Sequence, residues 1–154
     1  MRLSHGFTLL ELLVVMVIVG ITLGAVAFNA MPSERQVLQN EAQKIALLLQ
    51  SARDEAIVRN RPVAFETDGE GYRFLVRENN AWQPLLGDDL LRERPFKHPP
   101  LTLSITPPSV DQQTDRLRII FGREPVGIPF VLTLANSDAQ VAIRADGIGH
   151  FVVE

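Results

Sequence analysis

One acidic side chain lies inside the long apolar stretch that opens this 154-residue chain. From Phe7 to Ala30 the residues are almost all apolar, and Glu11 is the one ionisable side chain among them. A helix of that length measures about 36 Å, and about 20 apolar residues are enough to cross a membrane. Because a charge at the centre of a membrane helix costs roughly 2.5–3.5 kcal/mol, the retained carboxylate predicts a functional role.

The segment 7–30 is expected to be a retained membrane anchor. Arg2 is the basic side chain of the short leader, and since positive charge stays in the cytoplasm, the rest of the chain is expected across the membrane. A cleaved secretory signal is the alternative, because Ala25-Val-Ala27 offers a small-x-small cleavage site. Against it, an acid near the start of the apolar region is unusual in such signals, and the region exceeds their typical length of about 7–15 residues.

Composition argues against several kinds of function. The net charge is −3, whereas nucleic-acid binding needs a basic face, and the absence of cysteine excludes disulfides and thiol chemistry. His5, His98 and His150 lack metal-ligand spacing, and no Gly-x-Ser-x-Gly motif or phosphate-binding glycine loop is present. Asp88-Asp89 and Asp68-Gly-Glu70 match no recognised calcium loop and are interpreted as solvated turns. We expect no catalytic, cofactor or metal site.

A second helical segment follows the apolar one. Met31-Pro32-Ser33 interrupts the helix, and Ser33 with Gln36 resembles a capping box that restarts it. Apolar residues then recur at steps of four and three, which predicts one buried face: Leu38, Ala42, Ile45, Leu49, Ala52 and Ala56. Arg61-Pro62 is expected to end it. Residues 31–61 are thus predicted to be the amphipathic second half of a long N-terminal helix, packed on a soluble domain.

Residues 62–154 read as an antiparallel β domain, which gives an α+β fold. The turn-forming sequences Asp68-Gly-Glu-Gly71 and Asp146-Gly-Ile-Gly149 predict hairpins. The segment 87–115, rich in proline and charge, is expected to be a variable loop around one strand. It is either a carrier of specificity or a solvated excursion. Strands are predicted at 63–67, 72–76, 82–86, 101–105, 116–121, 130–134, 141–144 and 150–153.

The run from Gly6-Phe7-Thr8 through Glu11 to Val15 resembles the N-terminal signal of type IV pilins and type II secretion pseudopilins. The resemblance implies that a prepilin peptidase removes the leader, residues 1–6, by cutting between Gly6 and Phe7 on the cytoplasmic side. The same enzyme then methylates the new amine of Phe7. It also implies that Glu11 directs subunit assembly.

The implied cut has a physical consequence for Glu11. It creates an α-amine at Phe7, with a reference pKa of about 7.7–8.0, about 6 Å along the helix axis from Glu11. If neighbouring helices are staggered, the amine of one subunit meets Glu11 of the next, and the pair is costly to break in apolar surroundings. Pairing within one chain is the alternative, because positions i and i+4 share a helix face.

Gly20 and Gly24 form a small-xxx-small pair inside the apolar segment. Such pairs let membrane helices approach closely. Glycine is also frequent in membrane helices without such a role, and we weigh the two interpretations equally. Gly20 and Gly24 are therefore candidates for helix packing.

The C-terminal half refines the resemblance. Phe121-Gly-Arg-Glu-Pro125, then Phe130 to Leu134, then Asp146-Gly-Ile-Gly149 followed by His-Phe resemble the H-type minor pseudopilins of type II secretion. That family implies a long helix packed on two antiparallel sheets. Pilin-like chains often carry a proline inside the membrane helix, whereas here Pro32 lies beyond Phe28, which leaves the position of any kink open.

The resemblance implies a structural protein without catalytic activity. It would sit in the bacterial inner membrane with its domain in the periplasm and join the pseudopilus near the tip. Its implied partners are the major pseudopilin, the I-, J- and K-type minor pseudopilins, secreted proteins and the secretin, and no nucleic acid. Two alternatives remain: a minor pilin of a type IV pilus or DNA-uptake system, and a membrane-tethered periplasmic binding domain.

Overall fold

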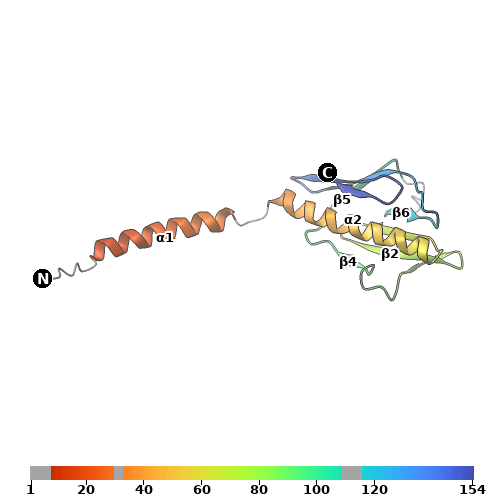
Figure 1. The fold of residues 1–154 in the computed structure, drawn as a ribbon, viewed down its shortest axis with the longest axis horizontal. Helices are drawn as coiled ribbons and strands as arrows, with labels where there is room; N and C mark the ends of the chain where they lie inside the picture. Colours follow the sequence, from red (N-terminus) through yellow and green to blue (C-terminus); the bar gives the residue numbers. More distant parts are fainter. Residues whose placement is uncertain (1–7, 30–32, 109–115) are drawn as a thin grey trace. The chain divides into compact units, whose positions relative to one another are not determined.

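The computed structural model describes residues 8–29, 33–108 and 116–154. The chain divides into two compact units, and the boundary along the sequence falls after Ser33. The first contains helix α1 (Leu9–Asn29), and the second, Glu34–Glu154, contains helix α2 (Glu34–Val58) and the strands (Figure 1). No helix within the described ranges is both long enough and apolar enough to cross a membrane. Residues 30–32, where the interruption at Pro32 was predicted, lie outside the described ranges.

Helix α2 confirms the predicted amphipathic face. It begins at Glu34, directly after Ser33, and every residue of the predicted stripe is buried. The helix ends at Val58, slightly before the predicted Arg61-Pro62. Asn60 takes a left-handed conformation with φ 54°, and the Arg61 N–H donates to the Ala56 carbonyl at 3.1 Å. That conformation closes the last turn because asparagine tolerates it better than most residues.

The first sheet has the strand order β3-β2-β1-β6, with the short β4 also paired to β2, and all pairs are antiparallel. Its strands are β1 (Val63–Thr67), β2 (Gly71–Glu78), β3 (Ala81–Pro84), β4 (Arg94–Pro95) and β6 (Leu117–Phe121). The β1–β2 hairpin turns at the predicted position. β4 was not predicted, and residues 109–115 of the predicted loop lie outside the described ranges.

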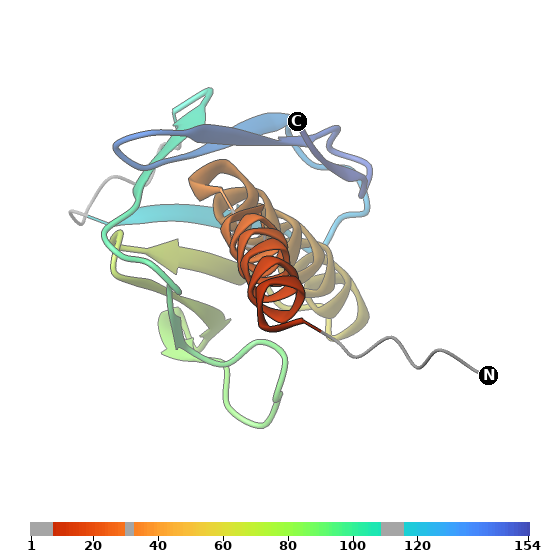
Figure 2. The ribbon, with the colours of Figure 1, turned by 90° about the vertical axis from the view of Figure 1, so that its left-hand side faces the viewer.

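The second sheet has the order β5-β7-β8-β9 and is also antiparallel. Its strands are β5 (Thr102–Thr106), β7 (Phe130–Ala135), β8 (Gln140–Ala145) and β9 (Phe151–Val153). Figure 2 shows the two sheets as separate layers, and α2 contacts strands of both. The predicted α+β class, a helix packed on two antiparallel sheets, is therefore confirmed.

A single hydrophobic core joins α2 to the two sheets. Alternate residues of β1, β2, β6, β7 and β8 belong to this core. Phe65 of β1 and Phe74 of β2 lie there in edge-to-face contact, with ring centres 5.5 Å apart. Leu132 and Ile143 are fully buried on the second sheet. Burial of each such side chain stabilises the fold by about 1.5–3 kcal/mol, whereas the alanines of α2 allow the helix to approach closely.

The face of the first sheet that points away from α2 carries charged and aromatic side chains. Trp82 on β3 lies against two guanidinium groups: Arg118 of β6 at 5.6 Å and Arg77 of β2 at 5.8 Å from the ring centre. Such cation–π contacts contribute about 0.5–1 kcal/mol each at exposed sites. The indole therefore helps to cover a face that α2 does not reach.

Candidate assembly interface

The described chain begins one residue after Phe7, the predicted first residue of the processed protein. Gly6 and Phe7, the predicted cleavage and methylation residues, lie outside the described residues. Thr8 is the first described position, and helix α1 starts immediately after it at Leu9. The geometry of the Phe7 amine relative to Glu11 therefore stays a prediction.

Glu11 lies in the first turn of α1 and is exposed to solvent. Its backbone N–H donates to the Thr8 side-chain oxygen at 3.3 Å and to the Thr8 carbonyl at 3.1 Å. Thr8 therefore caps the helix, and the Thr8-x-x-Glu11 spacing matches a capping box. An acid in the first turn also interacts favourably with the helix dipole. This local role of Glu11 was not predicted from the sequence, although the Thr8-x-x-Glu11 spacing indicates it.

Gly20 and Gly24 lie one turn apart on α1. A Cβ added to either would meet no described atom within 4 Å. Neither glycine is therefore needed for packing within the described chain, and each leaves a shallow site for a neighbouring helix. The hydroxyl of Thr22, between them, donates to the carbonyls of Ile18 and Val19, both at 2.9 Å. Its polarity is thus satisfied inside the helix.

The apolar surface of α1 is extensive. Its large apolar side chains from Leu9 to Leu23 are 43–83% exposed. Exposed apolar patches of this size mark protein or membrane contacts. The following side chains contribute: Leu9, Leu10, Leu12, Leu13, Val14, Val15, Met16, Val17, Ile18, Val19, Ile21 and Leu23.

In the second unit, Glu66 of β1 is a buried carboxylate surrounded by arginines. Its side chain is 1% exposed, and it accepts hydrogen bonds from Arg73 (Nε, 2.8 Å), Arg118 (Nε, 2.9 Å) and Arg116 (Nη1, 3.3 Å). Although burial opposes ionisation, the hydrogen bonds from Arg118 and Arg73 hold the pKa of Glu66 below its ordinary value. Arg116 also pairs with Asp68 at 3.2 Å, so three guanidinium groups share two carboxylates and one positive charge remains.

The two acidic turns considered for calcium direct their carboxylates at their own backbone. Asp68 Oδ1 accepts from the N–H groups of Glu70 (3.1 Å) and Gly71 (3.2 Å). Asp88 Oδ1 likewise accepts from Leu90 (2.8 Å). Within the described residues, no group of three histidine, aspartate or glutamate side chains is placed to hold a metal ion. The interpretation as turns therefore accounts for both sequences.

Asp146 organises the C-terminal hairpin. Its Oδ1 accepts from the N–H groups of Ile148 (2.8 Å), Gly149 (3.1 Å) and His150 (3.1 Å). Its Oδ2 lies 2.6 Å from the His150 ring. The bond to the His150 ring, together with these backbone bonds, lowers the pKa of Asp146 to about 2. His150 is thus engaged in a turn.

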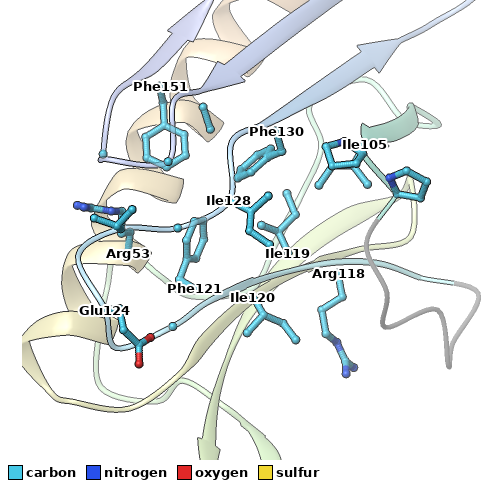
Figure 3. Close-up of a pocket in the computed structure, with 18 residues that line it drawn as sticks. Arg53, Ile105, Arg118, Ile119, Ile120, Phe121, Glu124, Ile128, Phe130 and Phe151 are labelled. Atoms are coloured by element: carbon cyan, nitrogen blue, oxygen red, sulfur yellow. The ribbon is translucent and has the colours of Figure 1, made fainter.

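A cavity of about 600 Å³ lies beside β6, between that strand, the loop 122–129 and β7. Figure 3 shows Ile119, Phe121, Ile128 and Phe130 converging on it, with Arg53 of α2 at one side. Most of its lining is apolar. Sequence analysis did not predict the cavity, because its walls come from segments that are distant along the chain.

The comparisons with known proteins agree with this geometry. The sequence model of the family described as type II transport protein GspH matches residues 41–149, and that of the prokaryotic N-terminal methylation motif matches residues 1–27. A type II secretion system protein H of Aeromonas hydrophila is 29% identical over 96% of this chain and 91% of its own length. One of Pseudomonas aeruginosa is 38% identical over 57% of this chain, and the match spans only 53% of that relative.

Solved structures show the same fold. The minor pseudopilin EpsH from the type 2 secretion system of Vibrio cholerae matches with a TM-score of 0.57 and 18% identity, over 76% of this chain and 95% of that one. The type IV minor pilin FimU of Pseudomonas aeruginosa matches with a TM-score of 0.53 and 18% identity, over 76% and 87%. Because the GspH match covers well over half of the sequence, the chain belongs to the GspH family of type II transport proteins, the H-type minor pseudopilins.

Proposed function

We propose that this protein is a structural subunit of the periplasmic pseudopilus of a type II protein secretion system, where it lies near the tip and connects the tip to the shaft of major pseudopilin. The observation that carries the proposal is the methylation motif over residues 1–27, which includes most of α1, the helix whose described large apolar side chains are exposed. A fibre subunit needs such a surface, because neighbouring helices cover it on assembly. The family match to GspH favours this function over that of a type IV pilus minor pilin.

Before assembly, the segment 7–30 would anchor the protein in the inner membrane, with the unit Glu34–Glu154 in the periplasm. The lone leader arginine, Arg2, favours this orientation. Prepilin peptidase would cut between Gly6 and Phe7 and methylate the Phe7 amine, which remains basic. The mature chain then begins with a cation followed, one helical turn later, by the Glu11 carboxylate.

Glu11 would set the stagger between subunits. Where neighbouring helices pack in a fibre, the Phe7 amine of one subunit meets Glu11 of the next, and a mismatched stagger strands a charge in apolar surroundings. Gly20 and Gly24 would allow the close helix approach that such packing needs. The partners are then the major pseudopilin and the I-, J- and K-type minor pseudopilins, and the fibre helps to drive secreted proteins through the secretin. The protein itself has no catalytic role.

The test separates the assembly role of Glu11 from its place in the Thr8 cap. Full-length Glu11→Gln and Thr8→Ala variants are expressed in a secreting bacterium that lacks the wild-type copy. Mass spectrometry reads the mature N-terminus, and cross-linking to the major pseudopilin reads incorporation. Both variants should be cut and methylated at Phe7. Glu11→Gln should lose incorporation, whereas Thr8→Ala, which loses a cap worth about 1 kcal/mol, should retain it.

Two results would refute the proposal. Wild-type protein that keeps residues 1–6 while supporting secretion would remove the cation that Glu11 is proposed to meet. Equal incorporation of Glu11→Gln and wild-type protein would show that the carboxylate serves the helix end alone. Replacement of residues 1–30 by an unrelated anchor provides a further control, because a tethered binding domain would keep its function and a fibre subunit would lose it.

A further inference from the structure

Strand β6 forms an open edge of the first sheet. It pairs with β1 on one side, and no described strand pairs with its other side. A free edge presents a row of backbone donors and acceptors that another strand can extend. Natural proteins usually protect such an edge with proline, charge or a covering segment, so the side chains along β6 show what it can accept.

The β1–β2 pairing shows which residues of β1 direct their N–H and C=O groups towards β2 and which direct them towards β6. The Arg77 N–H donates to the Pro62 carbonyl at 2.9 Å, so Pro62 faces β2. Successive residues of an antiparallel strand direct their backbone groups to alternate sides. Phe65, three residues beyond Pro62, therefore directs its N–H and C=O away from β2 and towards β6.

The pairing register between β1 and β6 shows which backbone groups of β6 point to the open edge. Ile119 pairs with Phe65, so the backbone groups of Ile119 are used within the sheet. Arg118 and Ile120, on either side of it, then direct their N–H and C=O groups outwards. These two residues provide the docking points for an incoming strand.

The charged side chains near Arg118 indicate which side chain an added strand should place beside it. Across one face of the sheet, Arg73, Glu66 and Arg118 follow one another on β2, β1 and β6. The charges in this row run positive, negative, positive. Nε and Nη2 of Arg118 both donate to Glu66, and Arg116 pairs with Glu66 and Asp68, so three guanidinium groups share two carboxylates here. The remaining positive charge makes the position beyond β6 complementary to a carboxylate. Ile120, 41% exposed in the neighbouring row, favours an apolar partner.

The apolar lining of the cavity favours apolar side chains on the other face of an added strand. Ile119 points to the opposite side of β6 from Ile120, towards the cavity (Figure 3). At the cavity, Val126 and Ile128 are 69% and 78% exposed. A strand placed along β6 would cover part of this apolar surface with its inward side chains, while its outward side chains lie beside Arg118 and Ile120.

We propose that the open edge of β6 binds an extended segment of a neighbouring pseudopilus subunit as an added strand. The segment places an apolar side chain in the cavity and a carboxylate beside Arg118. This inference rests on the proposed function for the source of the segment. Its chemistry follows from the backbone edge, the row of charges and the cavity.

The test uses peptide probes and the full-length protein in detergent micelles, with binding measured by isothermal titration calorimetry. The probe is a short peptide with valine at its inward positions. Its outward positions carry one glutamate, to lie beside Arg118, and one valine, to lie beside Ile120. This peptide should bind saturably. One control peptide replaces glutamate by lysine, and a second carries N-methyl groups on alternate amides, so that it cannot pair along one edge. Each control should bind at least roughly tenfold more weakly, the effect of losing about 1.4 kcal/mol.

An edge variant tests the same inference from the protein side. Ile120→Pro removes the outward N–H, and proline is tolerated on an edge strand where that group faces solvent. Ile120→Val keeps the N–H and the branched side chain. The proline variant should bind the valine–glutamate peptide at least roughly tenfold more weakly than the valine variant, with thermal unfolding confirming that both are folded.

Equal binding of the N-methylated and unmodified peptides would overturn strand addition, and equal or tighter binding of the lysine peptide would overturn the charge assignment. Absence of saturable binding by the valine–glutamate peptide would overturn the docking surface itself. None of these results bears on the processing of Phe7 or on incorporation through Glu11. The proposed function and this inference can therefore fail separately.

Discussion

The guanidinium of Arg53 occupies the space where a side chain on Gly149 would lie. A Cβ on Gly149 would be 2.7 Å from Nη1 of Arg53, and the glycine has φ +117°. Arg53 also donates to the carbonyls of Ile148, at 3.0 Å, and Pro125. One side chain of α2 thus holds both the loop 122–129 and the C-terminal hairpin, which together border the cavity.

Gly149→Ala should destabilise the folded chain by about 2–3 kcal/mol. Part of the loss is backbone strain at positive φ, and the rest arises because Arg53 must withdraw from its two carbonyl partners. Gly87→Ala is the matched control, since Gly87 has φ +92° but no atom within 4 Å of an added Cβ. Denaturant unfolding of the full-length protein in micelles measures both. Equal losses would show that the Arg53 contact adds nothing.

Glu66→Gln should lower the free energy of unfolding by about 2–3 kcal/mol. The substitution keeps the shape of the side chain but leaves three guanidinium groups without their shared anion. Those groups are partly exposed, so water limits the penalty. Glu154→Gln removes a carboxylate from an exposed pair with Arg144 and should cost far less, because water screens that pair. The same unfolding assay compares them, and similar losses would contradict the structural role of Glu66.

The C-terminal hairpin should weaken only at strongly acidic pH. The pKa of Asp146 lies at about 2, below its ordinary value of 3.8, so the unfolded chain binds a proton more readily than the folded one. The stabilisation is fully present above about pH 4 and is lost as pH falls through about 2. Carbon NMR of the Asp146 carboxyl should show its midpoint near 2, and Asp146→Asn should remove that contribution at every pH. A midpoint near 3.8 would show that the turn does not stabilise the anion.

Bulky replacements on α1 should act on assembly and leave the second unit unaffected. A Cβ at position 20 or 24 would meet no described atom within 4 Å, and both positions belong to the first compact unit. Unfolding of the second unit should therefore stay unchanged in Gly20→Leu and Gly24→Leu. In the fibre the same side chains would separate packed helices, and cross-linking to the major pseudopilin should fall severalfold. Ile21→Leu is the control on the same helix. Unchanged cross-linking of both glycine variants would identify these glycines as incidental.

The elements with a regular spacing of apolar residues, or with a clear turn sequence, could be predicted. The stripe from Leu38 to Ala56 gave the buried face of α2, and the Asp-Gly turns gave both hairpins, because spacing and turn chemistry are local properties. Strand β4 was not predicted, since Arg94–Pro95 pairs with β2 and has no period of its own.

In the candidate assembly interface, a contiguous motif could be recognised from the sequence, and the roles of its residues stay a prediction. Gly6, Phe7 and Glu11 stand out by spacing, although the capping contact of Thr8 was missed. The buried state of Glu66 could not be read from β1 alone, because its arginine partners come from β2, β6 and the residue just before β6. The cavity likewise depends on how separate segments meet.

The position of Trp82 has a practical consequence. It is the single tryptophan of the chain, and its ring lies against Arg118, one residue from the strand position at which Ile119 faces the core. Indole emission therefore reports on the charged face that Trp82 shares with Arg77 and Arg118, without any attached label. A shift in its emission wavelength, or quenching, would register a change in the surroundings of Trp82 and Arg118 as it happens. This holds in any mixture where the other proteins carry no tryptophan.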